Sequence, residues 1–329
     1  MRSAELFVSL QKKGAMTVKE VFELRKQGRI EEAYEAIRPM YAVHQGKYTT
    51  LCMFWTASDV MKKRLEEKRT DEAAKIFEAL LRVLPHVDDR DGKAHTAILN
   101  GALRLSEEVK AFSMLNFMEL HGNALLTDDD WKAPLPSPTP TGAAAGHPLP
   151  STAQRLLTRC FHELQEHPDT DHALQVMPLL QEAARRNGRN KNTLRYMAVV
   201  YRIMGEREKA IGIYRQLLTR HHDSYLYAEL AELTDEPGPK AALLCRAIQN
   251  QRQEKFRTGY RLALARLLAD RDKARAAHEL QKCIATRKAL GYTITRDLLA
   301  LQQQLAGAQP TTDAEQRDFY EKMAAKFPV

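Results

Sequence analysis

Apolar residues recur along the chain at intervals of three and four, which is the spacing of one face of an α-helix. Leu194, Met197, Ala198 and Tyr201 follow this spacing. Alternating patterns typical of strands are almost absent, and glycines fall mostly between the periodic runs, where turns are expected. The pattern predicts an all-α fold.

One phrase of the pattern is written twice, as GRIEEAYEAIRPM at 28–40 and as GEREKAIGIYRQLL at 205–218. In the second copy Gly205 is predicted to lie in a turn, where a residue without Cβ has no steric cost. Small Ala210 would let the two flanking helices approach closely, and Tyr214 would fill the space beside it. Residues 192–222 therefore predict a helical hairpin, the unit of a solenoid with a period of about 34 residues.

This hairpin resembles the tetratricopeptide repeat (TPR), whose small–aromatic–small pattern it matches. The matching residues are Leu194, Ala198, Tyr201, Gly205, Ala210 and Tyr214, and His222 replaces the final proline of the family. Further copies are predicted around Ala33, Ala73, Ala173, Ala241 and Ala276, and the second of these has Lys68 where glycine is expected. The resemblance implies a solenoid of TPR-like hairpins that binds extended partners along its concave face.

The stretch from Tyr225 to Asp272 resembles a second group, the bacterial TPR proteins of mobile-element or phage-conflict loci. Those proteins carry a cold-shock-like module after the helices, and no such module is present here. The chain instead ends in a predicted helix opened by a Thr312–Glu315 capping box. This resemblance implies an alternative function, as an RNA- or DNA-associated component of a bacterial conflict or regulatory system.

A proline-rich segment predicts how the chain is divided. Six of the fourteen prolines lie in 133–152, a composition that favours an exposed linker over a packed element; a docking segment for a reader of proline-rich peptides is the alternative. The predicted organisation is a helical TPR-like domain, a linker, a second helical domain with a basic surface and a capping helix, at 1–130, 131–153, 154–310 and 311–329 respectively.

The net charge of +8 is unevenly placed. Residues 1–132 contain 21 basic and 21 acidic residues, whereas the remainder contains 29 and 21. Within 246–296 there are thirteen basic and four acidic residues. Such a stretch is either solvated surface or a binding surface for an anionic partner. We expect an acidic segment of a protein as the partner, with RNA or DNA as the alternative.

The sequence predicts no enzyme, no cofactor and no metal site. It contains no glycine-rich phosphate loop and no H-E-x-x-H or G-x-S-x-G motif. His221 and His222 are adjacent, so on a helix they would point about 100° apart and rarely share one ion. The four cysteines are widely spaced, which suits free thiols in a reducing compartment. No secretory signal or membrane span is expected, so the predicted location is cytoplasmic.

The predicted hairpin also indicates which residues would face a binding partner. If Leu194 and its neighbours on the same face pack inward, then Asn192, Arg195 and Arg202 form the adjacent stripe. In the TPR family this stripe lines the concave groove.

The groove is extended by carrying the register of Leu194 into the next two repeats. Leu226 and then Tyr260 are taken as its equivalents, and the second of these two steps is slightly longer than the first. Tyr227 and Arg261 would then continue the stripe. The candidate binding residues, with one more arginine of the basic stretch, are Asn192, Arg195, Arg202, Tyr227, Arg257 and Arg261.

Overall fold

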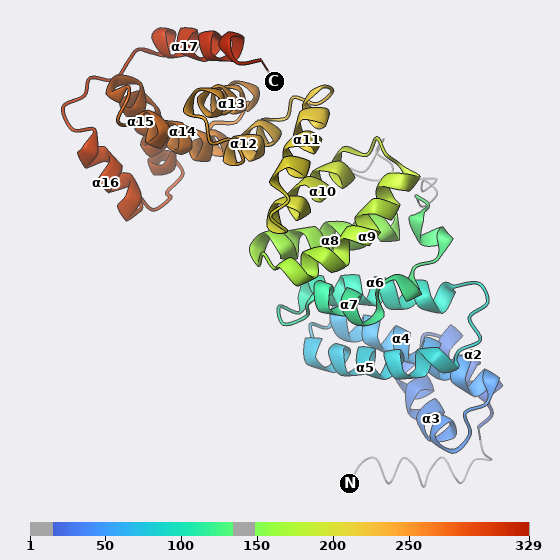
Figure 1. Cartoon of the computed structure of the whole chain (residues 1–329). Helices are drawn as coiled ribbons and strands as arrows, with labels where there is room; N and C mark the ends of the chain where they lie inside the picture. Colours follow the sequence, from blue (N-terminus) through green and yellow to red (C-terminus); the bar gives the residue numbers. More distant parts are fainter. Residues whose placement is uncertain (1–15, 134–148, 329) are drawn as a thin grey trace. The chain divides into compact units, whose positions relative to one another are not determined.

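The computed structural model describes residues 16–328 apart from 134–148 (Figure 1). Helices are the regular elements of this described part, which contains no strand, so the all-α prediction is confirmed. The chain divides into two compact units, unit 1 at 1–179 and unit 2 at 180–329. None of the helices in the described ranges is long and apolar enough to cross a membrane.

Unit 1 is a succession of helices that pack on their neighbours in the chain (Figure 1). They are α2 (Val18–Lys26), α3 (Ile30–Val43), α4 (Lys47–Glu66), α5 (Thr70–Val83), α6 (Lys93–Glu108), α7 (Met114–Leu125) and α8 (Thr152–Glu166), with short 3-10 helices η1 (Leu84–His86) and η2 (Asp128–Trp131). Helix α9 (Thr170–Arg186) contains the boundary between the two units. Helix α4 is central to unit 1, because it contacts α2, α3, α5 and α6.

Helix α8 follows the proline-rich segment but packs in unit 1, against α6, α7 and η2. Its Leu156 and Leu164 are fully buried. The Glu163 carboxylate accepts a hydrogen bond of 2.8 Å from the backbone N–H of Met114, at the start of α7. The division between the units therefore differs from the boundary predicted at 131–153. Composition predicts a linker here, but it does not show which core the next helix joins; residues 134–148 of the predicted linker lie outside the described part.

Unit 2 consists of helix pairs followed by two single helices (Figure 1). The helices are α10 (Lys191–Ile203), α11 (Arg207–Leu218), α12 (Ser224–Glu232), α13 (Pro237–Asn250), α14 (Glu254–Leu268), α15 (Lys273–Ala289), α16 (Arg296–Gln304) and α17 (Asp313–Lys326). The pairs are α10 with α11, α12 with α13, and α14 with α15. Helix α17 packs back on α13, and its predicted capping box between Thr312 and Glu315 is present.

The helix–turn–helix predicted over 192–222 is present as α10 and α11. Gly205 in the turn has a φ of 77°, in the left-handed region that glycine adopts without strain. Ala198, Ala210 and Tyr214 are fully buried where the two helices meet. The small residues let the helices approach, and the tyrosine ring fills the space beside them, as the repeated phrase indicates.

The same turn conformation occurs twice in unit 1. Gly28, between α2 and α3, has a φ of 75°, and Ala33 behind it is fully buried. Between α4 and α5 the equivalent position is Lys68, with a φ of 59°. Its ammonium group forms an exposed ion pair of 2.7 Å with Glu108. Lys68 thus holds a backbone conformation that is unfavourable for a residue with a side chain.

We expect Lys68→Gly to raise the free energy of unfolding by about 0.5 kcal/mol, because glycine removes the strain and an exposed ion pair is worth little. Lys68→Ala is the matched control, since it loses the ion pair but keeps the strain, and it should not stabilise. Urea unfolding followed by circular dichroism measures both. Equal stability of the two variants would show that the turn is not strained.

Candidate functional site

Basic side chains on α10 are paired with acidic side chains on α12. Arg195 forms an ion pair of 2.5 Å with Glu229, and its guanidinium carbon lies 4.7 Å from the ring centre of Tyr225. Arg202 forms a similar ion pair with Glu232. The predicted groove residues on α10 are therefore neutralised locally, and an acidic ligand would have to displace these carboxylates to reach them.

Two more pairs extend this row at the helix ends. Lys191 pairs with Asp223 at 3.0 Å, and Arg207 pairs with Asp235 at 2.5 Å. Asn192, the remaining predicted residue of α10, lies exposed in the first turn of the helix. The row as a whole is thus a ladder of ion pairs between successive helix pairs, which contributes to holding α10 beside α12.

Tyr227 is not a groove residue, which corrects the prediction for it. Its side chain is buried, and its hydroxyl lies 2.8 Å from Nδ1 of His222. The residues that precede α10 and α12 are Asn190 and Asp223, so Tyr227 occupies the position in α12 that Leu194 occupies in α10. That position faces the core, because Leu194 packs against the same buried cluster.

The groove position predicted for Arg261 is also wrong. Counted from Gln253, the residue before α14, Arg261 occupies the position that Ala198 occupies in α10. Ala198 is fully buried, and the Arg261 side chain is only 8% exposed. The step from α12 to α14 is shorter than the step from α10 to α12, whereas the predicted register made it longer. Because the step is shorter than predicted, Arg261 faces the core and not the predicted groove.

A buried polar network surrounds Arg261. Its Nη1 lies 2.8 Å from the carboxylate of Glu279, whose side chain has no exposed surface. The same carboxylate accepts hydrogen bonds from the amide of Gln316, at 2.6 Å, and from the hydroxyl of Tyr320. Burial is the largest influence on the pKa of the Arg261 guanidinium and lowers it, but Glu279, Tyr320 and Glu254 together raise it by more, so the pKa is raised. The network joins α14 and α15 to α17.

A hollow of about 590 Å³ lies next to this network, between α13, α14, α15 and α17. Its lining includes Arg257 and Arg261, which the structure brings together because both contact Glu254, at 2.5 and 3.3 Å. Two further cations, Lys282 and Arg317, line the same hollow, and Lys282 pairs with Asp313 at 2.8 Å. Sequence reasoning identified the two α14 arginines and missed the two cations of α15 and α17. These two lie on later helices, far from Arg257 in the sequence, so only the fold brings them near it.

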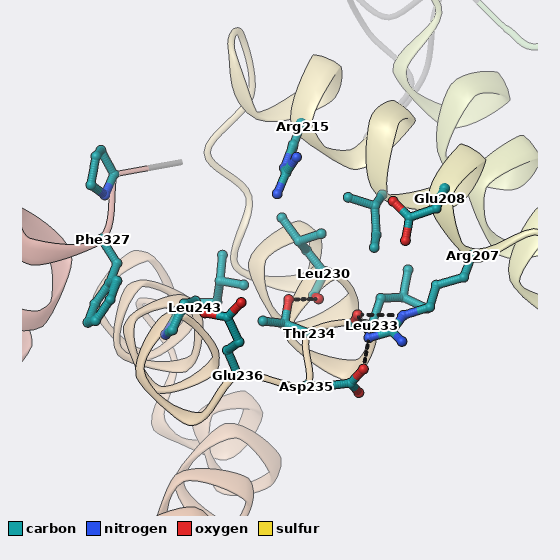
Figure 2. A pocket seen from close by; sticks show the side chains of 13 residues that line it. Arg207, Glu208, Arg215, Leu230, Leu233, Thr234, Asp235, Glu236, Leu243 and Phe327 are labelled. Atoms are coloured by element: carbon teal, nitrogen blue, oxygen red, sulfur yellow. Dashed lines mark hydrogen bonds and ion pairs between the residues drawn. The ribbon is translucent and has the colours of Figure 1, made fainter.

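A second hollow, of about 470 Å³, lies between α11, α12, α13 and the end of the described chain (Figure 2). Figure 2 shows Arg207 directed at Asp235 and at the carbonyl oxygen of Leu233. Phe327 lies beside Gly238, where an added Cβ would come within 2.7 Å of the ring. Acidic and basic side chains both line this hollow, so its charge does not select an anion.

The four cysteines lie in the interior as free thiols. All four are buried, and burial raises the pKa of each thiol. Among the residues that the structure describes, no group of three His, Cys, Asp or Glu side chains could hold a metal ion.

Because the thiolate is the reactive form, the folded chain should react with Ellman's reagent far more slowly than the chain in urea, where all four thiols become accessible. Absorbance at the wavelength of the released thiolate follows the reaction. One thiol of the folded chain that reacted at once would contradict the buried placement.

Comparison with known protein families gives a match within unit 2. A family model described as a domain of unknown function (DUF7017) matches residues 194–326. This range begins inside α10 and ends with the last residue of α17, so the helix pairs and α17 are matched together. No match to a curated protein was found.

Proposed function

We propose that this chain is a non-enzymatic scaffold of TPR-like helical hairpins, and that unit 2 binds an acidic partner. The observation that carries this proposal is the charge of the two units. Unit 2 contains 27 basic and 17 acidic residues, whereas unit 1 contains 23 and 25. A positive surface on one unit attracts acidic partners and speeds their association.

The TPR-like part of the proposal is supported by three turns that have the same backbone conformation and the same pattern of buried residues after them. Each turn has a left-handed residue, at Gly28, Lys68 and Gly205. Five residues later each has a fully buried alanine, and four residues after that a buried large side chain: Ala33 and Ile37, Ala73 and Phe77, and Ala210 and Tyr214. Helix pairs built in this way stack into solenoids, which present extended binding surfaces.

The binding surface that we propose lies on α14–α17 rather than on α10. The α10 cations are paired with α12 acids, so little of the excess charge is available there. Between Arg246 and Arg296 the basic residues outnumber the acidic ones thirteen to four, and several of them are exposed. An acidic protein segment and a nucleic acid both fit this charge, and the exposed aromatic side chains described below favour the second.

Charge reversal tests the proposal on the full chain. We expect Arg252→Glu, Lys288→Glu and Arg317→Glu together to weaken binding to heparin, a generic polyanion, by at least tenfold. The three side chains are exposed, so the fold should be unaffected. Binding of the unaltered chain should also fall steeply with salt, because neutralised anions release their counterions. Elution from a heparin column and a titration at several salt concentrations measure both effects.

The matched control places the same charge change in unit 1. Lys62, Lys75 and Arg104 are exposed, and their reversal to glutamate also lowers the net charge by six. This variant should retain most of the binding. If both variants lost binding equally, the effect would reflect net charge alone and unit 2 would not be the binding unit.

A further inference from the structure

Three exposed large apolar side chains of unit 2 lie near one end of the α14–α15 pair. Phe256, in the first turn of α14, is 54% exposed, and Leu290 and Tyr292, just after α15, are 41% and 51% exposed. A fourth, Leu299, is 48% exposed and lies apart from them, because α16 contacts the other end of α14 through the ion pair of Asp297 with Arg266. A single exposed apolar residue is ordinary, but several that gather in one region of a surface indicate a contact site.

The pairing of α14 with α15 brings the two aromatic rings to one end of the pair. The Cys283 thiol lies 3.4 Å from the carbonyl oxygen of Thr258, so the last turns of α15 lie beside the first turns of α14. After α15 the chain reverses at Gly291, with a φ of 70°. Arg287 then holds the following loop by donating a hydrogen bond of 2.8 Å to the carbonyl oxygen of Thr293. Tyr292 is therefore fixed at the same end of the pair as Phe256.

Cations accompany both rings. The Lys255 ammonium lies 4.7 Å from the ring centre of Phe256, and the Arg287 guanidinium carbon lies 5.8 Å from that of Tyr292. The stretches 251–260 and 284–296 contain six basic residues and one acidic residue, Glu254. That carboxylate is already shared by the two α14 arginines described above. This end of the pair thus combines uncompensated positive charge with exposed aromatic surface.

We propose that this surface binds single-stranded nucleic acid. The hairpin-end patch consists of Arg252, Lys255, Phe256, Arg287, Lys288 and Tyr292. Its cations contact backbone phosphates, and bases stack on the rings of Phe256 and Tyr292, the combination that single-strand-binding proteins use. The inference rests on the proposed function, that unit 2 binds an acidic partner, and it names the chemistry of that partner.

The two rings distinguish nucleic acid from an acidic protein segment. A run of carboxylates would use the cations alone and would leave two exposed aromatic rings without a role. Bases have a flat π-face that stacks on such rings, and each stack contributes a substantial part of the affinity. The bases of a duplex are already stacked on one another, so this mode of binding requires a single strand.

The test uses the full chain and fluorescence anisotropy with three labelled probes: an oligothymidylate of about 15 nucleotides, a duplex of the same length and a poly-L-glutamate of similar charge. The double variant Phe256→Ala and Tyr292→Ala keeps every charge. It should weaken binding to the single strand by at least tenfold and leave binding to poly-L-glutamate unchanged. Phe256→Tyr with Tyr292→Phe keeps both rings and should bind like the unaltered chain.

An aromatic control comes from unit 1, where Tyr48 is 69% exposed; Tyr48→Ala should have no effect on any probe. The inference is overturned if the double alanine variant binds the single strand normally, or if duplex and poly-L-glutamate bind as tightly as the single strand. In either case the proposed function survives, since unit 2 still binds polyanions. If no probe binds the unaltered chain at low salt, both the inference and the proposed function fail.

Discussion

Replacing Arg261 by glutamate should lower the free energy of unfolding by about 3–5 kcal/mol, because it leaves buried carboxylates without a counter-charge. Glu279 has no exposed surface, and Arg261 is its cationic partner at 2.8 Å. The donors that remain, from Gln316 and Tyr320, are neutral and cannot balance a second carboxylate. Urea unfolding of the full chain, followed by circular dichroism, should show a transition at a clearly lower urea concentration.

Two variants make this prediction specific. Arg266 lies on the same helix, but its side chain is 52% exposed and pairs with Asp297 at 3.3 Å, so Arg266→Glu should change stability by less than about 1 kcal/mol. Replacing Arg261 and Glu279 together by methionine removes both charges and keeps most of the volume. It should recover most of the lost stability, because buried ion pairs are often replaceable by apolar residues. If Arg261→Glu were no worse than Arg266→Glu, Arg261 would not be a core residue.

Replacing Tyr214 by alanine should lower the free energy of unfolding by about 3–5 kcal/mol, because it opens a large cavity in the core of unit 2. The tyrosine is fully buried and belongs to the same cluster as Ala198, Ala210 and Leu226. Tyr214→Phe keeps the ring and should cost no more than about 1 kcal/mol. The same urea experiment measures both variants.

The alanine variant also tests the repeated phrase. If Tyr214→Ala were as stable as Tyr214→Phe, the aromatic position of the phrase would not be a packing position. The similarity between residues 28–40 and 205–218 would then have no structural meaning.

Local features of the fold could be predicted because they depend on neighbouring residues. The spacing of apolar residues indicated helices, and the phrase around Gly205 indicated a turn between two closely packed helices. Both are present, with Ala210 and Tyr214 fully buried. The capping box between Thr312 and Glu315 depends on residues three apart, and it too is present.

Features that depend on exact register or on distant partners could not be predicted in this way. The register that makes Tyr260 the equivalent of Leu194 predicts Arg261 in a groove. Helix α14 begins earlier in the sequence than that register requires, and Arg261 therefore lies in the core. The proline-rich segment that precedes helix α8 predicts that this helix belongs to the second domain. Its apolar face packs in unit 1, a choice that periodicity does not determine.

One signal in the sequence could have identified the ion pairs of α10. Acidic residues follow its basic residues by about one repeat length, as in Lys191 with Asp223 and Arg195 with Glu229, which are 32 and 34 residues apart. Opposite charges at the spacing of a helical repeat are expected where equivalent helices of adjacent repeats lie side by side. Comparing charges at that spacing would have shown that the predicted groove residues already had partners.

Hydrogen exchange of the full chain, with and without saturating heparin, is the most direct test of where the acidic partner binds. The proposal predicts slower exchange in peptides that cover 251–260 and 284–296, at the hairpin-end patch, and unchanged exchange throughout unit 1. Slowing confined to α10 and α12 would restore the groove predicted from the sequence, and slowing confined to unit 1 would contradict the proposal that unit 2 binds the acidic partner.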